Sequence, residues 1–563
     1  MRNSSANGTK GQTDWNAVNW RQVNRRVRNL RQRIFRASRE NDLAEVRSLQ
    51  NLMLRSYSNT LKSVRQVTQE NKGKYTAGVD GIVTTTVAER NELTDDLMSA
   101  QPWRAAPARR VYIPKVGGKL RPLGIPTIRD RALQARVKNA LEPYWEARFE
   151  PCSYGFRPGR GCHDAIARIY NVAAPVRRRK WVLDADIKGA FDNIDHEFLL
   201  NAVDGFPARE LIRQWLKAGY MERGVFHDTD SGTPQGGVIS PLLANIALHG
   251  MEAAVGVKYI TRGDNVGKRC LIRYADDFVV FCDSEEDARQ ARVELSAWLA
   301  ARGLVLSDEK TRIVHLSDGF DFLGFNIRQY RAPETRWGWK LLIKPSRKSV
   351  KSLKARMVRE WRGLDGQNIV TVLTRLNPII RGWSNYYRSV VSKRLFAQLD
   401  SWTFGKEVRW ARKTHPKKPW YWVRRKYWGK LHPKRMDYWV FGDAAGDHGR
   451  LIKFAWTPIV RHILVKGGSS PDDPALQDYW KWRRSRRHAE LSGRQQVLAK
   501  EQGGVCFRCG ETLHNDEALC AHHIMAPRLG GKRTLDNQRL MHLYCHLQAL
   551  AAERSERDRK RFA

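Results

Sequence analysis

Two adjacent carboxylates, Asp276 and Asp277, lie between two apolar segments that are rich in Val, Ile and Phe. This pattern predicts a β-hairpin with both acids at its turn. Aspartate is a common turn residue, so the pair could be a polar turn and nothing more. Two carboxylates on an apolar hairpin are costly unless a cation neutralises them. The natural cation is Mg²⁺, which proteins hold through one or two carboxylates together with substrate phosphates.

A third acid, Asp186, stands 90 residues before Asp276 at the end of a predicted strand in residues 181–186. Enzymes that join nucleotides hold two metal ions between carboxylates, and these ions clamp the attacking and leaving oxygens. The three acids together therefore predict a two-metal site.

Residues 109–123 read as strand, glycine turn and strand, with Lys115, Lys119 and Arg121 around the turn. These cations could be exposed, or they could grip a triphosphate.

The composition predicts a polyanionic partner. The chain has 563 residues, with 100 Lys and Arg against 58 Asp and Glu, a net charge of +42. Such an imbalance favours nucleic acid. A membrane is the weaker alternative because no apolar run approaches the roughly 18 residues of a spanning helix. The N-terminus has no apolar segment typical of a signal peptide, so we expect the protein to stay in the compartment where it is made.

Helical periodicity begins at Trp20 and continues to about residue 67. The first part of this region carries seven arginines in sixteen residues. They could form a solvated face, although so dense a group favours phosphate contact.

Residues 401–490 hold 21 Lys and Arg, 8 Asp and Glu, and 9 of the 20 Trp. Aromatic rings among cations suit nucleic acid, while several of these Trp must also form a core. Residues 467–474 read as a boundary.

Several ordered motifs resemble one known family. Residues 274–277 (YADD) and 186–192 (DIKGAFD) are similar to the two acidic boxes of reverse transcriptases, and residues 234–236 (PQG) to the loop beside the incoming nucleotide. Residues 113–115 (IPK) and 121–122 (RP) are similar to the strand pair that holds the triphosphate. With the basic N-terminal region, residues 303–310 (GLVLSDEK) and 381–387 (RGWSNYY), the chain resembles a group II intron-encoded reverse transcriptase/maturase.

This resemblance implies a multidomain α+β fold, a right-hand polymerase with fingers, palm and helical thumb. Mg²⁺ would be held by Asp186, Asp276 and Asp277. Nucleotide-binding residues would be Lys115, Arg121, Phe191, Gln235 and Tyr274. The ring of Phe191 would lie under the sugar and exclude a 2′-hydroxyl; core packing is its rival role. The domains expected are 1–100 (basic helical extension and start of the fingers), 101–180 (fingers), 181–345 (palm), 346–400 (thumb, or domain X), 401–495 (basic DNA-binding region) and 496–563 (nuclease).

Four of the eight cysteines lie in the last 58 residues, and this clustering predicts a metal site in preference to disulfides. The segment resembles an HNH endonuclease with a ββα-metal fold. On that resemblance structural Zn²⁺ would bind Cys506, Cys509, His542 and Cys545. His523 would be the general base, Asn537 would orient its loop, and His522 and His546 would hold a catalytic divalent ion. Many relatives have Asp in place of His522.

One alternative concerns the metal ligands. His542 and His546 are spaced i, i+4 on a predicted helix and could both bind the catalytic ion, which would leave Cys520 to complete the zinc site. A second alternative is a purely structural zinc knuckle that binds DNA.

The resemblance implies a function that joins these activities. The protein would bind its group II intron RNA, assist splicing, nick target DNA and copy the RNA from the nicked 3′ end with deoxynucleoside triphosphates. It would act in a prokaryotic cytoplasm or nucleoid, or in an organelle matrix. Two alternatives are a host-domesticated reverse transcriptase and a splicing factor with a silent polymerase.

Overall fold

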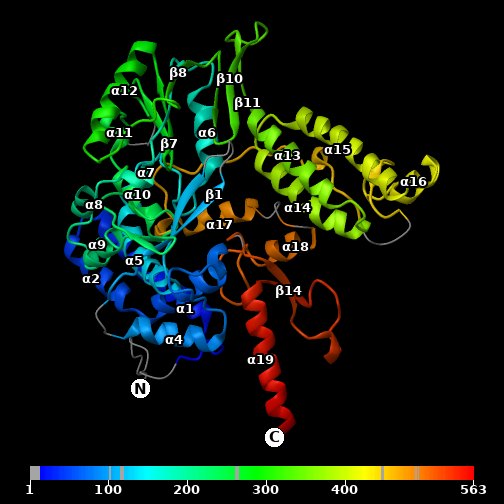
Figure 1. Cartoon of the computed structure of the whole chain (residues 1–563), viewed down its shortest axis with the longest axis horizontal. Coiled ribbons are helices and arrows are strands. Elements are labelled where there is room, and N and C mark those ends of the chain that lie inside the picture. Colours follow the sequence, from blue (N-terminus) through cyan, green and yellow to red (C-terminus); the bar gives the residue numbers. More distant parts are fainter. Residues whose placement is uncertain are drawn as a thin grey trace.

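The computed structural model describes residues 13–99, 103–114, 120–259, 265–444, 449–487, 491, 493–515 and 517–562, with backbone alone from residue 556 onwards. Within these ranges the chain forms two lobes with a smaller C-terminal unit between them (Figure 1). The larger lobe holds the N-terminal helices and the two four-stranded sheets, and the second lobe is helical. Across the described residues, no helix combines the length and the apolar character needed to cross a bilayer.

The N-terminal helices pack around a long central helix. They are α1 (Trp20–Arg39), α2 (Leu43–Arg55), α3 (Tyr57–Arg65) and α4 (Val87–Met98), and the central one is α5 (Ile128–Glu146). Asn19 caps α1 by accepting a hydrogen bond from the backbone N–H of Gln22. The apolar stripe of α1, which includes Val23, Val27 and Ile34, is buried against its neighbours.

The arginines of α1 are divided between internal contacts and the surface. Arg31 pairs with Glu142 and Asp472, and Arg33 pairs with Glu45. Arg21 and Arg28 reach the C-terminal unit, whereas Arg25, Arg26 and Arg36 are exposed. The sequence could not separate these groups because spacing along a helix does not reveal which acids lie opposite it.

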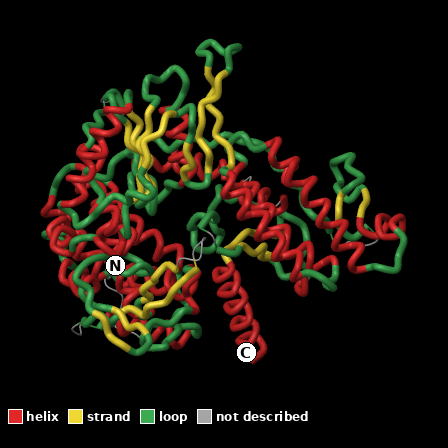
Figure 2. Tube along the Cα trace, turned by 45° about the horizontal axis from the view of Figure 1, so that its top comes forward, coloured by secondary structure: helices red, strands yellow, loops and turns green. Residues whose placement is uncertain are grey.

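Two four-stranded sheets form the body of the larger lobe, and helices cover them (Figure 2). The first has the order β2-β1-β4-β5, with β1 Ala108–Pro114, β2 Leu120–Ile125, β4 Tyr220–Glu222 and β5 Val225–His227. The second is antiparallel with the order β6-β7-β3-β8, with β3 Trp181–Asp186, β6 Cys270–Tyr274, β7 Asp277–Cys282 and β8 Arg312–His315. Helix α12 Glu285–Ala300 packs on β3, β7 and β8, and α6 Cys162–Val172 packs on β6. The other helices of this region are α7 Ala190–Asn193, α8 His196–Ala202, α9 Arg209–Leu216, α10 Ser240–Ala247 and α11 Met251–Ala254.

Strand β7 lies between two hydrophobic cores. Phe278 and Val280 belong to the core shared with the N-terminal helices, while Val279 and Phe281 belong to the core shared with the helical lobe. Successive side chains of a strand point to opposite faces of the sheet, so a strand covered on both faces is apolar throughout. The apolar run after Asp277 thus joins both lobes through one strand.

The helical lobe begins after a three-stranded sheet with the order β11-β10-β9. These strands are β9 Phe320–Phe322, β10 Phe325–Arg331 and β11 Trp339–Pro345; the helices that follow are α13 Arg347–Gly363, α14 Ile369–Tyr387, α15 Lys393–Thr414 and α16 Trp420–Tyr427, and a short pair β12 Trp428–Gly429 and β13 Val440–Phe441 completes the lobe. Helix α15 runs through the domain boundary expected at residue 400. Trp410 and Trp428 are buried in the core, whereas Trp439 remains exposed.

Residues 467–474, where the sequence indicated a boundary, are packed against the larger lobe. Asp472 and Asp473 accept ion pairs from Arg31 and Arg39 of α1, and Arg160 donates to the carbonyl oxygen of Ser469. Ser470 is fully buried. Polar turn composition predicts a loop but does not tell whether the loop is buried. This strap leads to α17 Gln477–Arg486, α18 Gly493–Glu501, the hairpin β14 Leu519–His523 and β15 Gln538–His542, and α19 Leu543–Phe562.

The helical lobe contains one strongly perturbed acid, Glu407 of α15. Burial raises the pKa of Glu407 to about 8, and a hydrogen bond from the indole N–H of Trp428 offsets part of that effect. The folded protein therefore keeps this proton up to about pH 8, while the unfolded chain loses it near its ordinary pKa of 4.5. Between these values the folded state binds more protons, so the free energy of unfolding falls as pH rises.

We expect Glu407→Gln to remove this dependence, because glutamine keeps the acceptor and cannot ionise. At pH 8.5 the variant should be more stable than the wild type by about 2–5 kcal/mol, and at pH 4.5 the two should differ little. Thermal unfolding followed across this pH range measures the effect. Glu334→Gln, at an exposed acid in the β10–β11 turn, is the control. Equal pH profiles for Glu407→Gln and the wild type would contradict the assignment.

Candidate polymerase and metal sites

The three predicted acids meet at one edge of the antiparallel sheet. Asp186 is the last residue of β3 and lies directly opposite Asp277, the first residue of β7. Tyr274 of β6 also pairs with Asp277, so Ala275 and Asp276 form a two-residue turn. The predicted hairpin and the predicted strand end are both present, and sheet register brings together acids that are 90 residues apart.

The turn has a strained backbone. Ala275 has a φ of 59°, in the left-handed region that residues with a Cβ atom rarely adopt. Gly155 lies against it so closely that a Cβ there would be 2.3 Å from the backbone nitrogen of Ala275. Such strain persists only where the surrounding structure fixes it, and it clusters at functional sites.

Burial and mutual repulsion both disfavour the ionised forms of these acids. Burial, reinforced by the charges of Asp276 and Asp186, raises the pKa of Asp277 to about 7. Burial also raises the pKa of Asp276, with Asp186 adding to the shift. Lys310 forms an ion pair with Asp186, and this contact raises the pKa of the lysine. A buried group of carboxylates that repel one another suits a divalent cation with oxygen ligands.

Lys310 was not assigned a role from the sequence, although it ends the GLVLSDEK segment of the resemblance. The spacing of that segment gave no sign that the lysine reaches Asp186. Lys310 lies in the turn before β8, whereas Asp186 ends β3. The contact depends on the loop before β8 folding back along β3, where the backbone N–H of Ser307 donates to the carbonyl oxygen of Asp186.

A cavity of about 400 Å³ opens beside the acids. Its lining includes Asp276 and Asp277 together with four of the five residues expected to bind nucleotide, namely Arg121, Phe191, Gln235 and Tyr274. The fifth, Lys115, lies outside the described residues, as does Lys119. The fold thus gathers residues from β2, the β3–α7 region, the loop before α10 and the β6–β7 turn around one space.

Phe191 has both of the positions that the sequence left open. Its ring lines the cavity and also packs, half-buried, against the core. The ring of Phe156 meets it edge to face at a centroid distance of 6.1 Å. Phe156 also lines the cavity and has a φ of 59°, but the sequence offered no signal for it. Gln235 donates to Asp192, one residue after Phe191.

A buried arginine supports the catalytic turn from within the protein. Arg273, only 1% exposed, donates to the side-chain oxygen of Asn245 at 2.9 Å and to the carbonyl oxygen of Ala275 at 3.3 Å. Asn245 in turn donates to the carbonyl oxygen of Gly155. These bonds connect α10, the turn and the Gly155 loop, which is why the strained backbone holds its shape.

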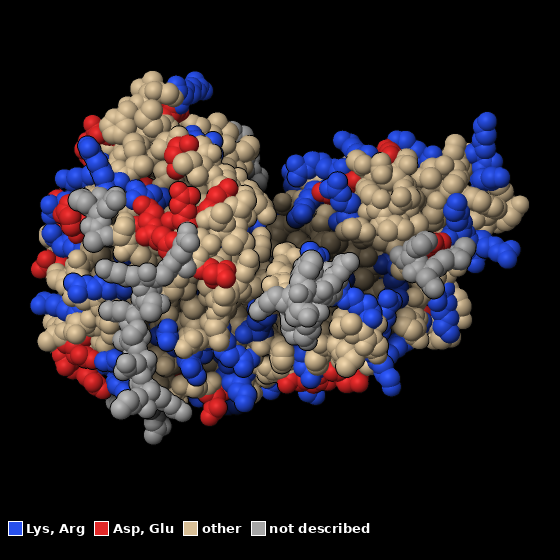
Figure 3. Space-filling view, turned by 90° about the horizontal axis from the view of Figure 1, so that it is seen from below, with Lys and Arg blue, Asp and Glu red and all other residues tan. Residues whose placement is uncertain are grey.

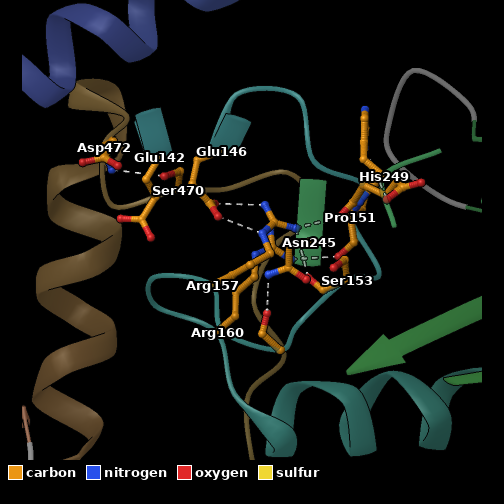
Figure 4. Close-up of polar contacts among 12 residues, drawn as sticks. Glu142, Glu146, Pro151, Ser153, Arg157, Arg160, Asn245, His249, Ser470 and Asp472 are labelled. Atoms are coloured by element: carbon orange, nitrogen blue, oxygen red, sulfur yellow. Dashed lines mark hydrogen bonds and ion pairs between the residues drawn. The ribbon is translucent and has the colours of Figure 1, made fainter. Parts of the chain in front are cut away.

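Below this layer the Gly155 loop is fixed by an ion pair that is almost completely buried. Arg157 contacts both carboxylate oxygens of Glu146 at 3.0 Å and donates to the carbonyl oxygen of Ser153 (Figure 4). On the same helix, α5, Glu142 accepts from Arg31, which also binds Asp472 of the strap. The turn, α5, α1 and the strap are therefore linked by consecutive paired charges.

The C-terminal unit contains a closed cluster of metal-ligating atoms. Cys506, Cys509, His542 and Cys545 are all buried, and their ligand atoms lie within 4.8 Å of one another. His542 turns Nδ1 toward Cys509 at 3.4 Å, and its Nε2 lies 3.0 Å from the carbonyl oxygen of Thr512. A second hydrogen bond of this kind orients histidine ligands. Four such ligands and no open position are typical of a structural tetrahedral ion.

The alternative ligand set is not what the structure forms. His542 is the last residue of β15, and α19 begins at Leu543, so His542 and His546 do not lie on one helical face. Cys520, in β14, lies outside the four-residue cluster and is not buried. The i, i+4 spacing was misleading because the strand-to-helix junction falls between the two histidines.

His546 instead faces His522 of β14. Their Nδ1 atoms lie 3.2 Å apart, so one ion could bind both rings. Glu553 of α19 lies 3.2 Å from the opposite nitrogen of His522, a contact the sequence did not indicate. Next to this pair, the side-chain amide of Gln538 donates to Nε2 of His523, which leaves that nitrogen as an acceptor.

Asn537 fastens the loop that follows His523. It accepts from the backbone N–H of Met525 and donates to the carbonyl oxygens of Met525 and Lys532, each at 2.8–2.9 Å. These bonds hold the segment directly after His523, and the role of Asn537 in orienting the base stays a prediction. The hairpin β14–β15 followed by α19 has the predicted ββα order.

Positive charge is spread over the helical lobe. Seen from below, Lys and Arg side chains project from much of that lobe and border the hollow between the lobes, while a group of acids lies on the larger lobe (Figure 3). Cations also cover aromatic rings here, such as Lys406 over Trp402 and Arg424 over Trp439. Such a surface suits a polyanion that passes between the lobes.

The fold is that of a right-hand reverse transcriptase, because it combines a palm sheet with three aspartates, fingers strands beside a cavity and a helical thumb. A ββα-metal nuclease unit is attached to it. Family comparisons agree. Residues 113–327 match "Reverse transcriptase (RNA-dependent DNA polymerase)" and residues 15–97 match "N-terminal domain of reverse transcriptase". Residues 350–428 match "Group II intron, maturase-specific domain", and residues 506–549 match "HNH endonuclease".

Related proteins come from bacteria and from an organelle-type intron. Protein YkfC of Escherichia coli is 37% identical over 309 residues, 48% of this chain and 81% of that protein. The group II intron-encoded protein LtrA of Lactococcus lactis is 35% identical over 287 residues, 40% of this chain and 47% of LtrA. A 91 kDa protein in the cob intron of Schizosaccharomyces pombe is 28% identical over 53% of this chain and 46% of its own length.

The chain belongs to the group II intron-encoded reverse transcriptase/maturase family and carries an HNH endonuclease domain at its C-terminal end. By these domains it is an RNA-directed DNA polymerase and a DNA endonuclease. The match spans about half the length of LtrA and of the cob intron protein.

Proposed function

We propose that this protein binds its own group II intron RNA, assists its splicing, nicks a target DNA and copies the intron RNA from the nicked 3′ end. The observation that carries the proposal is the meeting of Asp186, Asp276 and Asp277 beside a cavity lined by the expected nucleotide-binding residues. The presence of a nuclease domain on the same chain adds a source of the DNA primer.

In the polymerase site, Asp186 and Asp276 are the principal ligands that we assign to Mg²⁺, with Asp277 beside them. The bound ions would supply the charge that stabilises the attacking and leaving oxygens. Arg121 faces the same cavity and would hold the triphosphate, together with Lys115. Phe191, braced by Phe156, would limit space at the 2′ position of the sugar, while Gln235 and Tyr274 would line the pocket.

Asp276→Ala should abolish cDNA synthesis on a primed RNA template, a loss of about a thousandfold or more, because the metal site loses a ligand at the reacting phosphate. Binding of the RNA should change little, since Asp276 is an acid in a basic protein. Primer extension and filter binding measure the two effects. The control is Asp204→Ala, at a carboxylate that is 80% exposed and does not line the cavity. Surviving extension would overturn the metal assignment.

In the nuclease unit, we assign Zn²⁺ to Cys506, Cys509, His542 and Cys545 as a structural ion. His523 would take a proton from the attacking water. In this structure its Nε2 accepts a hydrogen bond from the side-chain amide of Gln538. His522 and His546 would hold a divalent ion at the scissile phosphate. Two imidazoles favour softer divalent ions than Mg²⁺, and Glu553 brings a carboxylate beside His522.

His523→Ala should abolish DNA nicking without releasing zinc, because the base and the structural ligands are separate groups. Cys506→Ser should lose both zinc and nicking. A supercoiled-plasmid nicking assay and metal analysis of the purified variants measure these outcomes. Unchanged nicking by His523→Ala would leave a purely structural zinc knuckle as the better description.

The nucleic-acid partners follow from the charged surfaces. We infer that the thumb helices grip both the template–primer duplex and the intron RNA, and that the basic region within 401–495 binds target DNA. The salt dependence of this binding should be strong. The intron's transcript would be met in a prokaryotic cytoplasm or nucleoid, or in an organelle matrix, which is where we place the protein.

RNA that co-purifies with the full-length protein should be dominated by one folded intron, because a maturase recognises its own RNA. Sequencing the bound RNA after expression from the native locus measures this. The Asp276→Ala variant should retain the same RNA and serves as the matched comparison. A mixed RNA population in both proteins would contradict the mobile-intron function.

A further inference from the structure

We call the part of the nuclease unit that carries Cys506, Cys509, His542 and Cys545 the knuckle. It is packed against the N-terminal helices of the polymerase. Its residues Cys506, Cys509 and Cys545 share one hydrophobic core with Trp20 of α1 and Val64 of α3. In Figure 1 the C-terminal unit adjoins the N-terminal helices. The knuckle is therefore enclosed on one side by a different domain.

One residue of the polymerase reaches a metal ligand. Arg65, at the end of α3, donates from Nη2 to the sulfur of Cys545 at 3.1 Å. Its side chain is 4% exposed, its Nε lies 3.1 Å from Glu70, and its guanidinium covers the ring of Trp20 at 4.5 Å. A buried arginine held on three sides has no freedom to turn away from the sulfur.

The backbone of the knuckle is also held from the N-terminal helices. Arg21 donates to the carbonyl oxygen of Phe507, and Asn24 donates to that of Cys509. Glu511, in the adjoining turn, pairs with Arg28 at 2.8 Å and lies 3.8 Å from Lys62. These contacts grip the peptide groups of the C-x₂-C turn that presents two of the four ligands.

A second group of contacts fixes the helix that carries Cys545. Gln548 of α19 donates to the carbonyl oxygens of Asn16 and Val18, before α1. Lys74 covers the ring of Tyr544 at 4.7 Å. Cys506, Cys509 and Cys545 thus lie on segments that the polymerase domain contacts. The fourth ligand, His542, ends β15 directly before α19.

The net charge of the Cys₃His metal site explains why Arg65 lies beside it. Three thiolates and a neutral imidazole around Zn²⁺ leave one negative charge in a buried place, and an uncompensated buried charge is strongly destabilising. Arg65 provides the compensating charge and an N–H···S hydrogen bond. Hydrogen bonds to ligand atoms tune metal sites, and their loss typically weakens metal affinity by about 10–100-fold.

We propose that Arg65 is a positioning residue for the nuclease, and that zinc binding and docking of the nuclease onto the N-terminal helices form one coupled equilibrium. The proposal rests on the zinc assignment given above. Its consequence is that the zinc-loaded knuckle is the joint that holds the nuclease at a fixed place on the polymerase. Loss of zinc releases that joint, and weaker docking lowers zinc affinity by the same factor.

The test is a competition between the full-length protein and a chelating dye for Zn²⁺. Arg65→Met should bind zinc about 10–100-fold more weakly than the wild type, and Arg65→Lys, which keeps a charge and a donor, should recover part of the loss. Arg55→Met, at an exposed arginine on neighbouring α2, should match the wild type. Wild-type affinity in Arg65→Met would overturn the proposal.

Gln548→Ala provides a second test that does not remove a group from the sulfur atoms. It breaks the docking hydrogen bonds to the carbonyl oxygens of Trp15, Asn16 and Val18, together with one from Arg508 within the nuclease unit, and coupling predicts a loss of zinc affinity of about fivefold. Limited proteolysis should show the nuclease unit cut free when zinc is chelated from the wild type. An unchanged affinity in Gln548→Ala together with an unchanged cleavage pattern after chelation would refute the coupling. Wild-type protein that purifies without zinc would instead overturn the zinc assignment, and this inference with it.

Discussion

Repulsion among three carboxylates is the constraint that the polymerase lobe is built to withstand. Asp186 and Asp277 are paired in register, and Asp276 follows in a strained turn, so none can move away from the others without breaking the sheet. Only Lys310 among the described residues forms an ion pair with this group. Burial and the two neighbouring acids raise the pKa of Asp277, and metal ions at this edge would relieve that cost.

Support for that edge comes from buried charges placed in series behind it. Arg273 holds the turn, Arg157 holds the loop beneath, and Arg31 joins α1, α5 and the strap. Removing one partner from a buried pair leaves an uncompensated charge, so each pair resists local opening. The strap is part of this system, since it returns from the helical lobe and closes on α1.

The two metal-binding regions are supported in opposite ways. The polymerase acids lie beside a cavity in which ions and substrate phosphates would complete the site. The Cys₃His cluster is buried, and the N-terminal helices contribute a guanidinium to its sulfur. An open site suits chemistry in which a substrate completes the coordination, whereas a closed site suits a structural role. The nuclease histidines lie between these cases, because His522 is buried whereas His523 and His546 are partly exposed.

The sequence alone determined the local features: the strand and turn that carry the acids, and the C-x₂-C segment followed by a later His and Cys, for which two ligand sets stayed open. These depend on residue types over a few positions, where apolar alternation, turn residues and C-x₂-C spacing act directly. Tertiary structure decided the contacts between distant segments, including Lys310 with Asp186, Phe156 with Phe191, and Arg65 with Cys545. It also decided that His542 ends a strand and that Ser470, Asp472 and Asp473 of the strap are buried. No local pattern encodes such pairings, because they depend on how sheets and helices pack and on which charge lies opposite another across a core.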